Sequence, residues 1–149
     1  MIELDNDRRY MQMALTEARR AYELGEIPVG AVIVSKNGRI LGRGHNLTEA
    51  LGDVTAHAEI QAITAAAQAL GGKYLTDCTL YVTVEPCLMC AGAIGWAQIS
   101  RVVIGTDDPR RGYSTLVKES PFHPRATVTT DVCSDECREL MQSFFKARR

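Results

Sequence analysis

A chain of 149 residues, 46% hydrophobic and 23% charged, has the composition of one folded domain (1-149) rather than of a disordered protein. Its formal net charge of -1 excludes a global polycation, so any contact with nucleic acid would depend on local basic patches. The N-terminal residues are acidic, and no apolar run approaches the roughly 20 residues that cross a bilayer. We therefore expect a cytoplasmic protein with no membrane contact.

The first half of the chain predicts a helix, a β-hairpin and a second helix. Asp5, Asn6 and Asp7 can cap a helix whose apolar residues recur at helical spacing as far as Gly25. The turn sequence at 36–38 favours a hairpin between an apolar, β-branched segment and its return strand. The elements expected after the first helix are, in order, strands over 29–34 and 39–44, a loop over 46–55 and a helix over 56–70.

The second half alternates strands with helices. Its expected elements are a strand over 79–84, a helix over about 87–97 with Pro86 at its start, a strand over 101–104, a loop over most of 106–124, a strand over 126–130 and a helix over 135–148. Strands separated by helices pair in parallel, and a hairpin adds an antiparallel edge. The pattern predicts an α/β fold, a three-layer α/β/α sandwich on a mixed five-stranded sheet.

Three candidate metal ligands fall at the starts of two predicted helices. His57 lies at the start of one, and Cys87 and Cys90 lie at the start of the next. Both starts belong to the end of the sheet where open α/β folds bind ligands, so these residues can converge. One imidazole and two thiolates suit a tetrahedral Zn²⁺ whose fourth position stays open for a water. Five cysteines, an odd count, argue against a disulfide framework and favour metal binding for this pair.

Glu59 stands two residues beyond His57, close enough to reach the metal-bound water without binding the metal. A carboxylate there can move protons while water attacks an amidine-like ring carbon and the amine departs. The pattern H-x-E followed by P-C-x-x-C is the signature of zinc nucleobase deaminases. The competing interpretations are a surface or capping histidine, and a structural zinc site that adds Cys133 and Cys137. Otherwise we expect Cys78, Cys133 and Cys137 to be small buried residues.

Several further stretches match one enzyme family. They are Ile27 to Val32, Gly44-His45-Asn46, Thr55 to Ile60, Thr79 to Ala93, Arg101 to Gly105 and the ending Phe144 to Arg149. In these residues the chain resembles the cytidine-deaminase-like superfamily and, more narrowly, the bacterial tRNA-specific adenosine deaminases. The zinc motif alone points to the superfamily. The Pro28-Val29-Gly30 stretch and the Phe-Phe ending with basic residues point to the tRNA enzymes.

The resemblance implies roles for individual residues and for the whole protein. The implied site consists of His57, Cys87 and Cys90 as ligands of one Zn²⁺ per chain, Glu59 as proton shuttle, Asn46 as a hydrogen-bond partner of the target nucleoside, Pro28, Val29 and Ala58 as its pocket lining, and Asp108 near its ribose. The implied reaction converts adenosine to inosine at the wobble position of a tRNA anticodon. The implied assembly is a homodimer with active sites near its interface. Glu85 belongs to the motif, but no chemical step is assigned to it.

Basic residues outside the zinc motif are the expected contacts to the phosphates of a tRNA anticodon stem-loop. They are Arg110, Arg111, Lys146, Arg148 and Arg149. Two segments depart from the family pattern, namely 94–98 and 113–125. In the family, the region around 121–125 lies beside the anticodon loop, so this departure concerns RNA contact rather than chemistry.

Two other functions fit the same motif. A deaminase of free guanine, cytosine or cytidine would use the same zinc site, and the net acidic charge and the altered loop favour it. A non-catalytic RNA-binding or partner subunit would keep zinc for structure, but such a subunit is expected to lack the shuttle Glu59. Activity on RNA should weaken steeply with salt, because phosphate contacts release counterions. The sequence leaves open which tRNA is modified.

Overall fold

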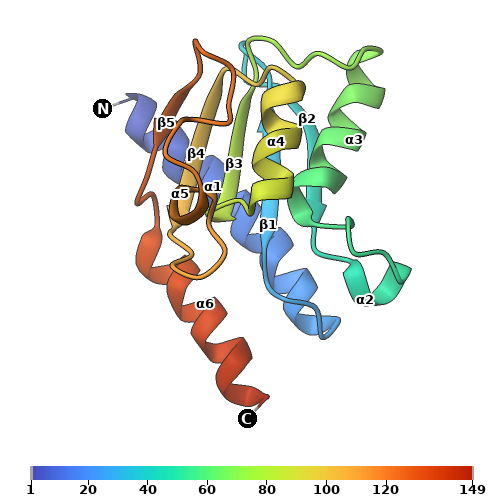
Figure 1. Ribbon diagram of the computed structural model, residues 1–149, viewed down its shortest axis with the longest axis vertical. Coiled ribbons are helices and arrows are strands. Elements are labelled where there is room, and N and C mark those ends of the chain that lie inside the picture. The colour runs from blue at the N-terminus through green and yellow to red at the C-terminus, as the bar shows by residue number, and fades with distance from the viewer. Residues whose placement is uncertain (1, 149) are drawn as a thin grey trace.

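A computed structural model describes residues 2–148, in which a five-stranded sheet is covered by helices on both faces (Figure 1). The elements in chain order are α1 (Ile2–Glu23), β1 (Gly30–Val34), β2 (Ile40–His45), α2 (Thr48–Leu51), α3 (Ala58–Leu70), β3 (Thr79–Val84), α4 (Leu88–Trp96), β4 (Arg101–Thr106), α5 (Tyr113–Leu116), β5 (Thr127–Thr129) and α6 (Ser134–Ala147). The predicted α/β sandwich on a mixed sheet is confirmed. None of these helices is both long and apolar enough to cross a membrane.

The strand order is β2-β1-β3-β4-β5. Strands β3, β4 and β5 pair in parallel, and β1 is antiparallel to both of its neighbours. The expectation that the hairpin adds an antiparallel edge is therefore wrong in one respect, because the antiparallel strand lies inside the sheet. Strand β1 is buried along its whole length, which suits an interior position, whereas Arg43 of β2 is exposed at the edge.

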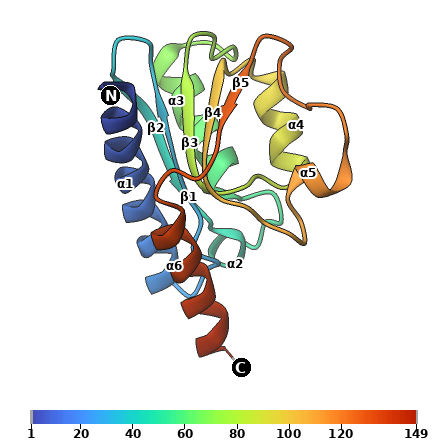
Figure 2. The ribbon, with the colours of Figure 1, turned by 90° about the vertical axis from the view of Figure 1, so that its left-hand side faces the viewer.

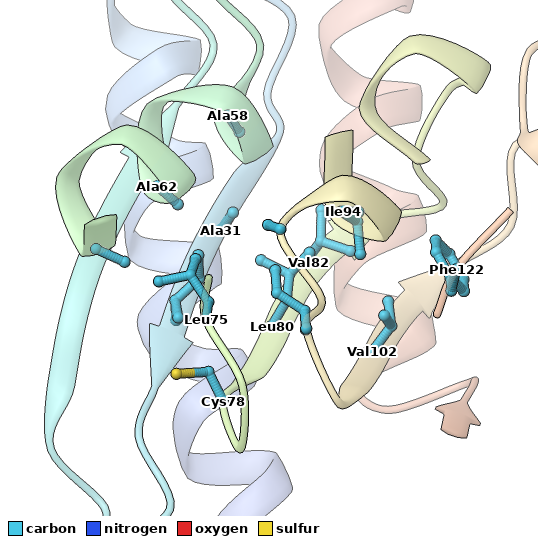
Figure 3. Close-up of a cluster of buried hydrophobic side chains, with 14 of the residues drawn as sticks. Ala31, Ala58, Ala62, Leu75, Cys78, Leu80, Val82, Ile94, Val102 and Phe122 are labelled. Atoms are coloured by element: carbon cyan, nitrogen blue, oxygen red, sulfur yellow. The ribbon is translucent and has the colours of Figure 1, made fainter. Parts of the chain in front are cut away.

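The two faces of the sheet carry separate hydrophobic clusters. Helices α1 and α6 cover one face, and α3 and α4 cover the other (Figure 2). Successive residues of β1 point to opposite faces, so Val32 packs with α1 while Ala31 and Ile33 join the cluster under α3. Cys78 lies in that second cluster with an exposed fraction of 2%, and it is a buried core residue as predicted (Figure 3).

Helix α3 approaches strand β2 more closely than side chains would allow. A Cβ on Gly44 would overlap the Ala58 carbonyl oxygen and lie 2.7 Å from the Ala62 backbone nitrogen. A Cβ on Gly42 would likewise overlap the Ala62 carbonyl oxygen. The α3 atoms nearest these glycines are backbone atoms of its alanines and the Cβ atoms of Gln61 and Ala66, so helix and strand meet almost backbone to backbone. The start of α3 is thereby fixed against the carboxyl end of β2.

We expect Gly44→Ala to lower the free energy of unfolding by about 1–3 kcal/mol, the usual cost of overpacking a tight contact. The matched control is Gly72→Ala, since a Cβ at Gly72 meets nothing within 4 Å. It should leave stability unchanged or raise it by up to about 1 kcal/mol. Urea unfolding of the three proteins measures the difference. Equal loss in both variants would contradict the close-contact explanation.

Three local elements differ from the predictions, and in each a side chain bonds across the fold. The first helix begins at Ile2, ahead of the expected caps. Asp7 lies within it, and its carboxylate accepts hydrogen bonds from Tyr81 Oη at 2.8 Å and from both terminal nitrogens of Arg101 at 2.7 Å. Helix α2 forms inside the predicted 46–55 loop, with Glu26 accepting two of its backbone N–H groups. Helix α5 forms inside the predicted 106–124 loop, where Glu85 has the same role.

Candidate active site

The three predicted metal ligands meet at one end of the sheet. His57 occupies the N-cap position of α3 and Cys87 that of α4, both with extended backbone, and Cys90 lies in the first turn of α4. Strands β2 and β3, which precede these helices, run in the same direction because the antiparallel β1 lies between them. Both helix starts are therefore brought to the carboxyl ends of their strands, as the sequence predicts.

The donor atoms of these residues have the spacing of a metal site. One donor atom each from His57, Cys87 and Cys90 lies within 4.8 Å of the other two, and Cys87 Sγ is 3.7 Å from His57 Nδ1. Sulfur and nitrogen ligands of a tetrahedral zinc ion, at about 2.3 and 2.0 Å from it, lie roughly 3.5–3.8 Å apart. The residues present therefore fit zinc, with three protein ligands and one open position.

The electrostatics of the group also favour a cation. Hydrogen bonding from Cys90, together with His57, lowers the pKa of the Cys87 thiol to about 4. The same contact with Cys87 raises the pKa of Cys90, and the neighbouring Cys87 thiolate raises the pKa of His57. Two thiols thus share one proton at a helix start, where the backbone dipole favours negative charge. A divalent cation in place of that proton stabilises both sulfurs as thiolates.

Glu59 lies beside the donor group without belonging to it. It sits in the first turn of α3 with an exposed fraction of 3%, and its side chain contacts Cys90. Burial raises the pKa of this carboxyl to about 7. A carboxyl group in that range takes up and releases protons near neutral pH, which is what a proton shuttle requires.

The residues expected to bind a nucleoside surround this end of the sheet. Asn46 directly follows β2 and is buried, and its Oδ1 has no hydrogen-bond partner within the described residues. Such an unpaired buried oxygen costs free energy unless a ligand supplies a donor. Pro28 and Ala58 are buried, and Val29 packs partly buried against the core, where its backbone oxygen accepts the Asn46 N–H at 3.3 Å.

Asp108 and two of the predicted basic residues share a loop between β4 and α5. Asp108 Oδ1 accepts the backbone N–H groups of Arg110 and Arg111, each at 3.0 Å, and both arginines are exposed. The other basic residues belong to a separate element. Lys146 and Arg148 lie at the end of α6, which extends beyond the carboxyl ends of the strands in both ribbon views (Figures 1 and 2).

The end of α6 is held against the end of α1. Arg148 stacks on the Phe144 ring with its guanidinium carbon 3.6 Å from the ring centroid, and Phe144 packs edge-on against Tyr22. Lys146 is exposed, whereas the Arg148 side chain is engaged in this cation–π contact. Arg149, also predicted to contact RNA, lies outside the described residues.

The two segments that depart from the family pattern pack against each other. A Cβ on Gly95 would overlap the Pro121 carbonyl oxygen, so this glycine permits the segment around 121 to lie on α4. Phe122 is buried in the cluster under α4 and packs edge-on against Tyr113 at 4.9 Å between ring centroids (Figure 3). The two segments are therefore in direct contact.

The remaining cysteines lie away from the donor group. Cys137 is buried against Gly105, and Cys133 is the half-buried N-cap residue of α6. Neither belongs to the His–Cys–Cys group found among the described residues, which gives no support to the competing four-cysteine zinc site. Sequence reasoning did not foresee the roles of Glu26 and Glu85. The one signal in the sequence was for Glu85, whose position directly before Pro86 makes it part of the zinc motif.

Comparison with known proteins identifies the family. The family model of the cytidine and deoxycytidylate deaminase zinc-binding region matches residues 4–106 of this chain. The chain belongs to this family. The predicted resemblance is confirmed, and with it the assignment of a zinc-dependent hydrolytic deaminase.

The names of individual relatives state a more specific activity than the family model does. A Bacillus subtilis protein named tRNA-specific adenosine deaminase is 43% identical over 150 residues, covering 98% of this chain and 92% of the relative. A solved structure from work on A-to-I editing by tRNA:A34 deaminases is 42% identical, with a TM-score of 0.82, covering 89% of this chain and 98% of that one. A guanine deaminase structure from Bacillus subtilis is also 42% identical, with a TM-score of 0.63. That match covers only 66% of this chain and 63% of the guanine deaminase chain.

We expect the purified protein to carry about one zinc ion per chain, as a three-ligand site requires. Cys90→Ala should lose the ion and lower the melting temperature, because binding to the folded state contributes to stability. Cys133→Ala is the matched control, since this thiol lies outside the donor group, and it should keep the ion. Elemental analysis and thermal unfolding of the three proteins test the assignment. Full zinc content in Cys90→Ala would contradict it.

Proposed function

We propose that this single deaminase domain converts adenosine to inosine at the wobble position of a tRNA anticodon. The proposal depends on one arrangement, the three-donor group of His57, Cys87 and Cys90 with the buried carboxyl of Glu59 beside it. That arrangement supports hydrolytic removal of an amine from a ring carbon. The names of relatives more than 40% identical over nearly the full chain support tRNA adenosine as the substrate.

His57, Cys87 and Cys90 would hold zinc, which when bound lowers the pKa of water to about 7. Water would add through its oxygen to C6 of the base. Glu59 would take one proton from the water and deliver it to ring N1. As the C6–N bond breaks, the amino group would accept the second water proton, by way of Glu59, and leave as ammonia. Adenosine and water thus give inosine and ammonia, with no net gain or loss of protons.

The residues around the donor group would orient the nucleoside. The unpaired Oδ1 of Asn46 would accept a hydrogen bond from the nucleoside, which supplies the donor that this buried oxygen lacks. Pro28, Val29 and Ala58 would line the pocket around the base. Asp108 would lie near the ribose, at the base of the loop that carries Arg110 and Arg111.

Contacts to RNA phosphates would come from Arg110 and Arg111 in the loop after β4 and from Lys146 and Arg148 at the end of α6. Arg149, the fifth proposed contact, lies outside the described residues. A loop base of an anticodon is not held in a duplex, so its entry into a zinc pocket breaks no base pair of a stem. We place the enzyme in the cytoplasm, where its thiolate ligands stay reduced. The five free cysteines are consistent with such an environment.

An anticodon stem-loop with adenosine at the wobble position should be converted to inosine, and 0.2 M salt should slow the reaction by about tenfold or more relative to 0.05 M. Glu59→Gln should abolish turnover and keep zinc, because the amide cannot carry protons. Mass spectrometry of RNA digests measures the product, and Cys133→Ala serves as the active control. Normal turnover by Glu59→Gln would contradict the proposed role of Glu59 as proton shuttle.

A deaminase of free bases is the second candidate, favoured by the partial match to a guanine deaminase and by the altered 113–125 segment. A parallel assay with free guanine, cytosine, cytidine and adenosine separates the two. If one of these is converted while the stem-loop stays unmodified, the tRNA assignment is wrong and the zinc chemistry stands.

We further infer that the protein is a homodimer that associates through α4. This helix is apolar on every side, and helices of that kind are normally buried all round. Its inner face packs on the sheet through Cys90, Ala91 and Ile94. Leu88, Met89 and Trp96 remain exposed on the outer face, and the first two adjoin the ligands. An apolar surface of this kind beside the site favours a second copy as its cover.

The wild-type protein should therefore have twice the chain mass of 16.4 kDa in light scattering. Trp96 is 84% exposed, and Trp96→Glu should shift the mass toward that of one chain, because a charge would be buried in the interface. Leu24→Glu is the control, as an exposed apolar residue at the end of α1. A wild-type protein that is monomeric at micromolar concentration would contradict this inference.

A further inference from the structure

Glu85 is a buried acid next to the site whose role the zinc chemistry leaves unexplained. It follows β3 directly and precedes Pro86 and Cys87, and its exposed fraction is 8%. Its carboxylate accepts three hydrogen bonds, all from the loop after β4. Oε1 accepts the Asp108 N–H at 3.2 Å, and Oε2 accepts the Ser114 N–H at 2.9 Å and the Ser114 hydroxyl at 2.6 Å.

Backbone hydrogen bonds also join the segment around Glu85 to the two ends of the loop that follows β4. The Glu85 N–H donates to the Thr106 carbonyl at 2.8 Å, and the Tyr113 N–H donates to the Pro86 carbonyl at 3.0 Å. Cys87 and Gly112 form an isolated antiparallel bridge. The strand that leads to the Cys87 ligand is thus attached to both ends of the 107–114 loop.

Gly112 indicates that the loop closes tightly around the acid. A Cβ at this position would overlap the Glu85 carboxyl group, so any side chain there would force the carboxyl group out of its present place. The carboxylate therefore occupies the interior of the loop. The same loop turns through Asp108, whose Oδ1 holds the N–H groups of Arg110 and Arg111 while their side chains remain exposed.

We propose that Glu85 is a positioning residue that sets the 107–114 loop in register with the Cys87 ligand and so aligns the RNA-contacting residues with the reacting base. The part concerning RNA rests on the proposed function, since Asp108, Arg110 and Arg111 are its proposed contacts. Glu85 itself has no part in the proton transfers.

The bonding pattern requires a carboxylate rather than an amide. Donors approach both oxygens of Glu85, two of them backbone N–H groups that cannot reverse their polarity. A glutamine would have to turn its NH₂ group toward one of these donors. Glu85→Gln therefore loses the bonds on one side of the loop while it keeps the volume of the side chain.

The test uses the zinc-loaded full chain as wild type, Glu85→Gln and Ser114→Ala. The control is Asp7→Asn, which removes a carboxylate that also accepts three bonds, two from Arg101 and one from Tyr81, distant from the loop. Three readouts are taken: KM and kcat on the anticodon stem-loop, zinc per chain, and the rate of limited trypsin cleavage after Arg110 and Arg111. The last readout needs no RNA.

Glu85→Gln should raise KM by about tenfold or more with a smaller change in kcat, because hydrogen bonds to a charged group are lost. It should keep about one zinc per chain and be cleaved faster in the loop. Ser114→Ala should change KM and the cleavage rate in the same direction but less. It serves as the test if Glu85→Gln does not fold. Asp7→Asn should lower the melting temperature but leave KM and the cleavage rate within about twofold.

Unchanged cleavage in both loop variants would overturn the proposal, as would an unaltered KM in Glu85→Gln. If the wild-type protein does not convert the stem-loop, the proposed tRNA function fails instead. In that case the trypsin readout still decides whether Glu85 orders the loop.

Discussion

The direct contact between α3 and β2 is the constraint on which the site depends. Gly42 and Gly44 carry no side chains, and they face mainly the backbone of alanines in α3, so helix and strand are separated by little more than backbone atoms. His57 ends the segment that enters α3, and Asn46 leaves β2 at the same end of the sheet. Any increase in the separation of the two elements would lengthen the distance between His57, a candidate metal ligand, and Asn46, a proposed contact of the nucleoside.

Buried carboxylates serve two different purposes in this fold. Glu26 and Glu85 each accept hydrogen bonds from distant loops and thereby hold α2 and α5 in place. Glu59 is buried beside the thiols, where loss of hydration raises its pKa to about 7. An acid that satisfies several donors stabilises structure, whereas an acid whose burial outweighs its hydrogen bonds can exchange protons.

The sequence was sufficient to predict the features that depend on local pattern. The sandwich, most of its helices and strands, and the meeting of His57 with Cys87 and Cys90 follow from periodicity and from the chemistry of a known spacing. Helices α2 and α5 were not predicted, because their stabilising partners, Glu26 and Glu85, lie more than 20 residues away along the chain. The interior position of β1 was not predicted for a related reason. Its pairing with β3 depends on contacts between residues far apart in the sequence, which local patterns do not show.

The place of β1 between β2 and β3 also links metal binding to strand pairing. The chain passes from the β1–β2 hairpin through α3 and returns as β3 on the free edge of β1, so this crossover makes the β1–β3 contact non-local. His57 lies before this crossover, and Cys87 and Cys90 lie after it. The donor group therefore comes into existence only when β3 has joined the sheet, so the free energy of metal binding is added to the closure of the central strands. A chain that retains its ion is one whose non-local strand pairing is complete.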